Sequence, residues 1–248
     1  MEPGNRSLKA LVLVFGNDSE ELAHAIEDRA FQMLNYWSNM DSKRQWVWLE
    51  GEGRPIINIW SADNTVLSRD AFEGYDFYFL TGDLNSPEVL AVRKAIRHMF
   101  IEKEFYITFL LATQGLQTGH IFENECCLSC QENTLINKDM VVDFIHDYCA
   151  QNIFPNMISV DFADYGKKIR GNTICLDYVG FDPDTLSLDR RIMPDAKNIF
   201  GVIFIEPEHY LPDNISTLIE KLIEPIALDF FITDVAYIGR NRILCLYY

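Results

Sequence analysis

The chain has 248 residues, of which 48% are hydrophobic and 13% aromatic, and a formal net charge of −16 at pH 7. A chain of this size and composition buries a sizeable core, as one large domain or two smaller ones. Its acidic balance argues against nucleic acid or an anionic membrane as the main partner. No apolar run approaches the roughly 20 residues that span a bilayer, and the first residues do not form a signal peptide. We therefore expect a cytoplasmic protein without direct membrane binding, whose six cysteines are mostly reduced thiols.

The chain opens with the pattern of a nucleotide-binding α/β unit. A short apolar run over 8–15 ends at Gly16, as a strand buried on both faces does. Asn17, Asp18 and Ser19 then offer a cap for a helix that continues to about residue 37. Strand, tight turn and helix in this order are typical of the start of such a unit.

The rest of the N-terminal half alternates strands with helices. Strands are expected over 45–50, 55–60, 75–81 and 105–112, and helices over 65–72 and 86–100. The segment 113–137 is polar and poorly patterned, and Cys126, Cys127 and Cys130 lie there in a predicted loop near His120. A structural zinc site needs four ligands, and no second cysteine pair follows at finger-like spacing. Plain thiols are favoured, and metal binding by the three cysteines stays an open alternative.

A helix is predicted over 138–151, with apolar residues along one side. His146 and Cys149 lie three apart on it, which suits a catalytic pair but also arises on any amphipathic helix. Farther on, the pattern predicts strands over 173–179 and 196–206, a helix over 215–226, and a terminal hairpin of strands 230–238 and 242–247.

Two acids, Asp161 and Asp164, follow the helix over 138–151, with Phe162 and Ala163 between them. Their spacing places both carboxylates on one side of a first helical turn. The helix dipole favours acids at that position, so an N-terminal cap would explain them without any further function.

The run Ser159-Val160-Asp161-Phe162-Ala163-Asp164 resembles the loop of the FtsZ/tubulin superfamily that follows the central helix and reads roughly N-x-D-F-A-D. The order of elements is similar to that family over most of the chain. The resemblance implies an α/β, FtsZ/tubulin-like two-domain architecture. It comprises a degenerate nucleotide-binding-like domain over 1–137 with a Rossmann-like parallel sheet, a central helix over 138–155, and a C-terminal mixed α/β sheet domain over 156–248. Each half would have its own sheet, and one continuous sheet shared by residues 8–112 and 173–248 would refute the assignment to this superfamily.

The glycine-rich phosphate loops of the family are degraded in this chain. The first turn, Phe15-Gly16-Asn17-Asp18, keeps one glycine, and Thr81-Gly82-Asp83-Leu84-Asn85-Ser86-Pro87 stands in place of the glycine-rich signature loop. Acids near both turns would repel a triphosphate. The remaining candidates for cofactor contact are Gly16, Asn17, Gly82 and Asn85. We predict no cofactor and no metal, with GTP as the alternative.

The resemblance implies that Asp161 and Asp164, with Ser159 at the family's Asn position, act in trans on the nucleotide of a neighbouring subunit. We therefore predict a pseudo-GTPase that is not itself an active enzyme and that caps or modulates FtsZ-type filaments in cell division. It would dock head to tail through 156–164 onto an FtsZ-type protein or a second copy of itself. Two alternatives stay open: a divergent self-assembling GTPase that uses the same acids, and an α/β interaction scaffold without a filament role.

Overall fold

A computed structural model of the chain describes residues 9–40, 56–61, 74–99, 107–114, 121–130, 135–151, 162–190, 199–223, 230–236 and 240–247. The strands are β1 (Lys9–Phe15), β2 (Ile56–Ser61), β3 (Phe77–Asp83), β4 (Thr108–Gln114), β5 (Glu125–Ser129), β6 (Asn172–Gly180), β7 (Ile199–Ile205), β8 (Phe230–Ala236) and β9 (Arg242–Tyr247). The helices are α1 (Ser19–Met40), α2 (Pro87–Met99), α3 (Lys138–Gln151), α4 (Phe162–Ile169) and α5 (Pro212–Ile223). None of these helices is long and apolar enough to cross a membrane.

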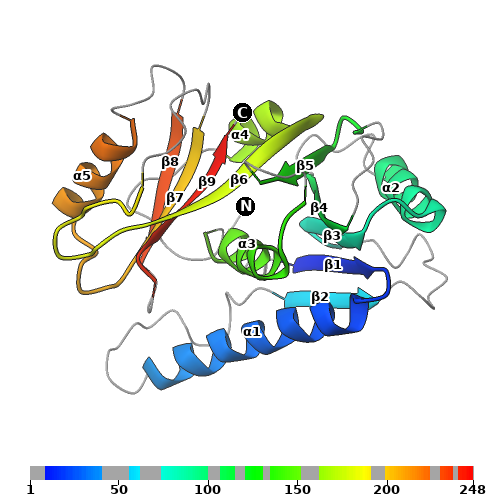
Figure 1. Cartoon of the computed structure of the whole chain (residues 1–248), viewed down its shortest axis with the longest axis horizontal. Helices are drawn as coiled ribbons and strands as arrows, with labels where there is room; N and C mark the ends of the chain where they lie inside the picture. Colours follow the sequence, from blue (N-terminus) through cyan, green and yellow to red (C-terminus); the bar gives the residue numbers. More distant parts are fainter. Residues whose placement is uncertain are drawn as a thin grey trace, which may run out of the picture.

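The described strands form one sheet in the order β2-β1-β3-β4-β5-β6-β9-β7-β8 (Figure 1). Neighbouring strands from β2 to β6 run parallel. β9 runs antiparallel to both β6 and β7, and β7 is parallel to β8. The predicted class is thereby confirmed, with a parallel N-terminal part and a mixed C-terminal part.

The prediction that each half has its own sheet is wrong, because β6 belongs to both parts. Residues 172–175 of β6 pair with β5, and residues 175–180 pair with β9. At nine residues, β6 is long enough to have one neighbour at its start and another at its end. The two parts of the sheet are therefore joined through a single shared strand.

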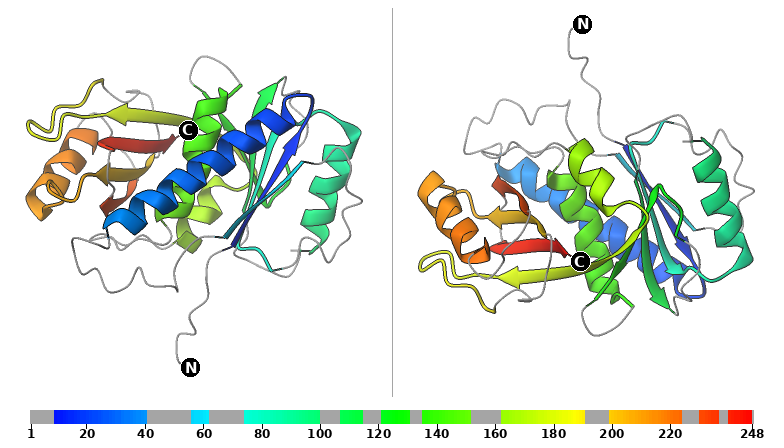
Figure 2. Two further views of the ribbon diagram at one scale, coloured as in Figure 1. Left: turned by 90° about the horizontal axis from the view of Figure 1, so that it is seen from below. Right: turned by 90° about the horizontal axis from the view of Figure 1, so that it is seen from above.

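Helix α3 lies between the two parts of the sheet, with α2 and α5 on their outer sides (Figure 2). Phe144 of α3 shares one buried cluster with Phe109 of the N-terminal part and with Phe200 and Phe204 of the C-terminal part. The ring centroids of Phe109 and Phe144 are 5.2 Å apart in an edge-to-face arrangement, which aromatic pairs prefer. The prediction that the helix over 138–151 packs on both halves is confirmed.

The predicted terminal hairpin is wrong in its pairing. Both strands are present, but β7 lies between them: Val202 of β7 pairs with Thr233 of β8 on one side and with Leu244 of β9 on the other. β7 and β8 are parallel, and parallel neighbours need a crossover connection such as α5. β9 then takes the free side of β7.

Two predicted elements of the N-terminal half, the strand over 45–50 and the helix over 65–72, lie outside the described residues. The segment 113–137, which was predicted to form loops, contains β5, so that prediction is wrong. β5 carries a buried acid, Glu125, whose carboxylate accepts hydrogen bonds of 2.8 and 2.6 Å from Arg93 of α2. A strand this short, with an acid and two cysteines among its five residues, gives too weak an apolar pattern to be recognised.

Candidate functional site

β1 and β3 end side by side at one edge of the sheet, where Phe15 pairs with Gly82 and the turn at Gly16 follows β1. Gly16 and Gly82 have φ angles of +92° and +97°, a region that glycine enters without strain. A Cβ atom on Gly82 would lie 2.0 Å from the carbonyl oxygen of Phe15, and one on Gly16 would lie 3.0 Å from Cβ of Asp83. Gly82 therefore allows the close pairing of β3 with β1, and Gly16 allows the turn after β1 to pass close to Asp83. The Phe15 carbonyl fills the space beside Gly82.

The charged groups at this edge are paired with one another. Lys138 begins α3 and places its Nζ 3.0 Å from Glu21 and 3.7 Å from Asp18. Gln114 donates a hydrogen bond of 3.1 Å to Asp18. The hydrogen bond to Glu21 is the largest of the effects that raise the pKa of Lys138. Two carboxylates thus compete with any phosphate for this lysine.

The N-terminus of α2, a natural place for a phosphate, is capped by the chain itself. The Ser86 hydroxyl accepts a hydrogen bond of 3.3 Å from the Val89 N–H. A hydrogen bond from its own backbone and one from Ser86 lower the pKa of Glu88, so a carboxylate stands at this terminus. The structure brings the four candidate cofactor-contact residues to this one edge: Gly16, Asn17, Gly82 and Asn85.

Helix α4, which carries Asp164, lies at the opposite edge of the sheet. A Cβ atom on Gly166 would lie 3.1 Å from Cδ1 of Ile107, the residue just before β4. α3 has 14 residues and spans about 21 Å between the two edges. Asp161 directly precedes α4, but Asp161 and Ser159 lie outside the described residues, as does the side chain of Asp164. Their contacts therefore stay predictions.

A group of five charged residues, fully buried at Asp147 and partly exposed at Arg29, joins α3 to α1 and to the C-terminal half. Asp147 is fully buried and accepts hydrogen bonds from Arg240, at 2.7 Å, and from Arg242. Asp143 lies 3.2 Å from Arg240, 2.5 Å from Arg242 and 3.3 Å from Arg29 of α1. Burial raises the pKa of Asp147, and the Arg242 charge counteracts that rise. We call these five residues the charge clamp.

The charge clamp was not predicted from the sequence, although the spacing of its residues is a signal for it. Asp143 and Asp147 are four apart, so they share one face of a helix that was predicted to be central. Arg240 and Arg242 are two apart, as are side chains on one face of an extended segment. Arg242 also stacks over the Tyr178 ring, 4.3 Å from its centroid. Buried carboxylates need such partners, so the clamp fixes the C-terminal half against α3.

His146 and Cys149 do not form a catalytic pair. The Nε2 atom of His146 is 3.1 Å from the Ile26 carbonyl oxygen, and burial lowers the pKa of His146 to about 4. The imidazole is therefore neutral at pH 7 and donates to that carbonyl. Burial raises the pKa of Cys149 to about 12, which keeps the thiol protonated and a poor nucleophile.

Two of the three clustered cysteines lie in a strand and not in a loop as predicted, and Cys130 lies just after that strand. Cys126 and Cys127 are successive buried residues of β5, and successive side chains of a strand point to opposite faces. Burial raises the pKa of Cys127 to about 11. The Sγ atom of Cys130 faces the Met140 sulfur at 3.5 Å. This arrangement does not bring Cys126 and Cys127 to one metal ion.

Two solved structures are similar in fold to this protein over nearly the whole chain. CetZ from Methanosaeta thermophila matches 96% of this chain with 86% of its own, at 13% identity and a TM-score of 0.58. CetZ1 from Haloferax volcanii, described as a GDP-bound monomer, matches 97% with 93% of its own, at 11% identity and a TM-score of 0.53. Comparisons with protein-family models and with curated proteins found no match.

The likeness to these proteins shows that the chain has an FtsZ/tubulin-type fold. The continuous sheet does not count against that fold, because the likeness extends over both sides of β6. The sequence criterion that a shared sheet would argue against the family was therefore wrong. At identities of 11 and 13%, the comparison concerns the fold and leaves the nucleotide chemistry to the residues of this chain.

Proposed function

We propose that the chain is an FtsZ/tubulin-type pseudo-GTPase that docks through residues 156–164 onto a nucleotide-bearing subunit and caps or modulates its filament. The observation that carries this proposal is the charge at the edge near Gly16 and Gly82, where Asp18, Glu21 and Asp83 gather and Lys138 is paired with two of these acids. The partner is an FtsZ- or CetZ-type protein or a second copy of the chain. The setting is the cytoplasm, in cell division or a related cytoskeletal process.

Electrostatics at that edge disfavour a triphosphate. Asp18, Glu21 and Asp83 lie beside the two turns, where relatives of this type have glycine-rich loops. A carboxylate a few Å from a phosphate costs on the order of 1 kcal/mol even with strong screening. Lys138 is the nearby described cation, and it is within ion-pair distance of two of these acids. Releasing it for a phosphate would leave both acids without that partner.

In this proposal the docking surface lies at the opposite edge. α4 lies there, with Asp161 just before it and Asp164 in its first turn. In trans, these acids and Ser159 would orient the water that attacks a neighbour's γ-phosphate, which is the role of a water-positioning residue in phosphoryl transfer. A subunit that offers one end of a head-to-tail contact and lacks the other stops a filament from growing. Capping therefore follows from the loss of one edge alone.

One observation favours a second function, a divergent GTPase that binds its own nucleotide. The fold is like that of CetZ1, which is described as GDP-bound, and the positive-φ glycines Gly16 and Gly82 remain at the corresponding turns. Under this alternative, Lys138 would leave Asp18 and Glu21 to contact phosphate, and the chain would assemble with itself.

The docking test mixes the chain with an FtsZ- or CetZ-type protein from its own host and follows GTP turnover and polymer sedimentation. Wild type is compared with Asp161→Ala and Asp164→Ala. Asp139→Ala is the matched control, because Asp139 is an exposed acid in the first turn of α3. We expect wild type and Asp139→Ala to change polymer mass at substoichiometric ratios, and the other two variants to alter that effect without loss of fold.

The contrary outcome is equal behaviour of all four proteins. If Asp161 and Asp164 are only helix caps, their alanine variants would lose about 0.5–2 kcal/mol of stability and still act on filaments as wild type does. That result would show that the two acids have only a structural role, and it would contradict the docking proposal.

A further inference from the structure

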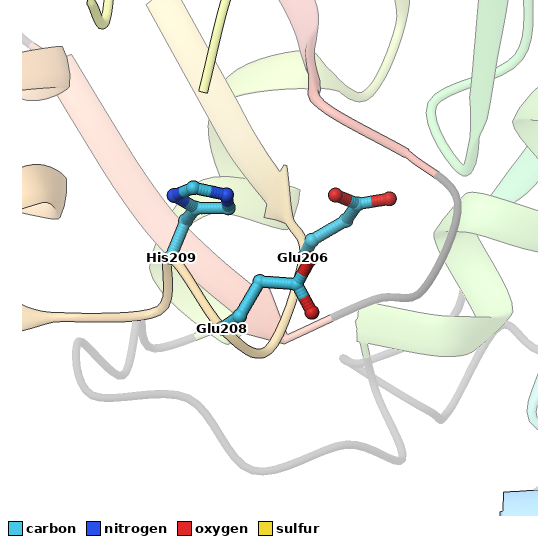
Figure 3. Close-up of side chains that lie close together, drawn as sticks. All are labelled: Glu206, Glu208 and His209. Carbon is cyan, nitrogen blue, oxygen red and sulfur yellow. The ribbon is translucent and has the colours of Figure 1, made fainter. Parts of the chain in front are cut away.

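Three side chains with metal-binding atoms gather in the turn between β7 and α5. One ligand atom from each of Glu206, Glu208 and His209 lies within 4.8 Å of the others. Figure 3 shows the three side chains grouped around this turn. Two carboxylate oxygens and an imidazole nitrogen form a mixed donor set, which differs from a solvated patch of acids because an unprotonated imidazole nitrogen has a lone pair that can bind a metal ion.

The backbone of this turn is held at both ends. The His209 N–H donates to the Glu206 carbonyl at 2.9 Å, and Pro207 between them suits the second position of a β-turn. The Glu206 N–H donates to the Asn241 side chain at 3.2 Å, and Asn214 of α5 donates to the His209 carbonyl at 2.8 Å. The donor set is thereby placed on a backbone that is already ordered.

A fourth group reaches the same turn from a different part of the chain. The Oδ1 atom of Asp184, in the loop after β6, is 4.0 Å from Nε2 of His209. A carboxylate beside a ligating histidine orients the ring by accepting the proton of its second nitrogen, or it completes the ligand set. Asp184 is far in sequence from the turn, so its position is independent of the local spacing of the other three residues.

We propose that Glu206, Glu208 and His209 bind a divalent transition-metal ion of the zinc class, with Asp184 as an orienting or fourth ligand. Imidazole with carboxylates suits Zn²⁺ and its neighbours in the first transition row, whereas Mg²⁺ prefers an all-oxygen shell. The ion would tie the loop after β6 to the end of β7. The site is independent of the proposed docking function, because it uses none of the residues assigned to docking.

The test titrates the full chain with Zn²⁺ by calorimetry and records amide NMR shifts at the turn. The matched control is His24→Gln, because His24 and Glu27 form an exposed histidine–carboxylate pair at 3.6 Å on α1 that lacks a third ligand in the described structure. We expect one Zn²⁺ per chain, shifts at residues 206–209, and about tenfold or greater weakening in His209→Gln and Asp184→Asn. His24→Gln should bind as wild type does.

Three results would overturn the proposal. The first is no saturable Zn²⁺ binding at the turn up to millimolar concentration. The second is an equal loss of affinity in His24→Gln and His209→Gln, which would indicate non-specific binding to histidines. The third is Mg²⁺ binding as tight as Zn²⁺, which would show that the imidazole is not a ligand. Because the His209→Gln chain can be checked for fold by its NMR spectrum, loss of binding is separable from unfolding.

Discussion

The carbonyl oxygen of Phe15 stands 2.0 Å from the position that a Cβ atom on Gly82 would occupy. Phe15 ends β1 and pairs with Gly82 of β3, so this contact holds together the ends of the two strands from which phosphate-binding turns would start in a nucleotide-binding relative. The glycine at position 82 is thus required by the packing of the chain on itself. A retained glycine at such a turn is not by itself a sign of ligand binding.

Substituting Gly82 should test this packing directly. Gly82→Ala must relieve the clash with the Phe15 carbonyl and accept a positive φ, whereas Gly74→Ala has a φ of +88° with nothing within 4 Å of its added Cβ. Positive φ alone costs an alanine about 1–2 kcal/mol. We expect Gly82→Ala to lose at least about 1 kcal/mol more than Gly74→Ala in urea unfolding. Equal losses would mean that the Phe15 carbonyl does not restrict the side chain at position 82.

The charge clamp should contribute strongly to stability. Arg242→Met removes one partner of both Asp143 and Asp147, and breaking a buried ion pair in this way costs about 3–5 kcal/mol. Arg29→Met is the control: the Arg29 side chain is 37% exposed, so its loss should cost no more than about 1 kcal/mol. Urea unfolding of the two variants measures the difference. A similar small loss in both would show that the clamp is not a buried network.

Stability should fall in mild acid because of His146. Its pKa is lowered from 6.5 to about 4 by burial, although the Ile26 carbonyl and the Asp143 charge act in the opposite direction. His146 therefore takes up a proton near pH 6.5 in the unfolded chain, but only near pH 4 in the folded chain. The contribution of neutral His146 to the free energy of unfolding is fully present above pH 6.5. It is lost as the pH falls from 6.5 to about 4, and the loss is on the order of 3 kcal/mol.

The measurement for His146 is the free energy of unfolding at a series of pH values from 7.5 to 4. The difference between wild type and His146→Gln isolates the histidine, since all carboxylates are common to both proteins. We expect the advantage of wild type to shrink across that range. A constant difference would show that the pKa of His146 is not lowered in the folded chain.

Elements with a strong apolar period could be predicted from the sequence, whereas strand pairing could not. β1 and α3 were found within about one residue, because a buried strand and a helix facing two sheets leave clear periods. The terminal hairpin was wrong because adjacency in sequence favours pairing, and nothing local in β8 or β9 indicates that β7 lies between them. β5 was missed because its buried Glu125 breaks the apolar pattern and is satisfied by Arg93, a partner 32 residues away.

In the candidate site, too, some features could be predicted from the sequence and others could not. The degenerate turns at Gly16 and Gly82 could be read from missing glycines and added acids, because those are local features. The pairing of Lys138 with Asp18 and Glu21 could not, since it joins the start of α3 to the start of α1 across more than a hundred residues. The charge clamp has the same long-range character. The type and spacing of charged residues can be read from the sequence. Which distant residues pair with those charges is known only from the folded structure.

The most direct measurement of the central claim is calorimetric titration of the full chain with GTP in the presence of Mg²⁺, with a GDP-binding CetZ protein as the positive control. We predict no binding up to about 100 μM GTP, which corresponds to a binding free energy weaker than about −5.5 kcal/mol. The physical reason is that acids stand beside both turns and that Lys138 is already paired with Asp18 and Glu21. A dissociation constant in the micromolar range would contradict the pseudo-GTPase account and favour a divergent GTPase.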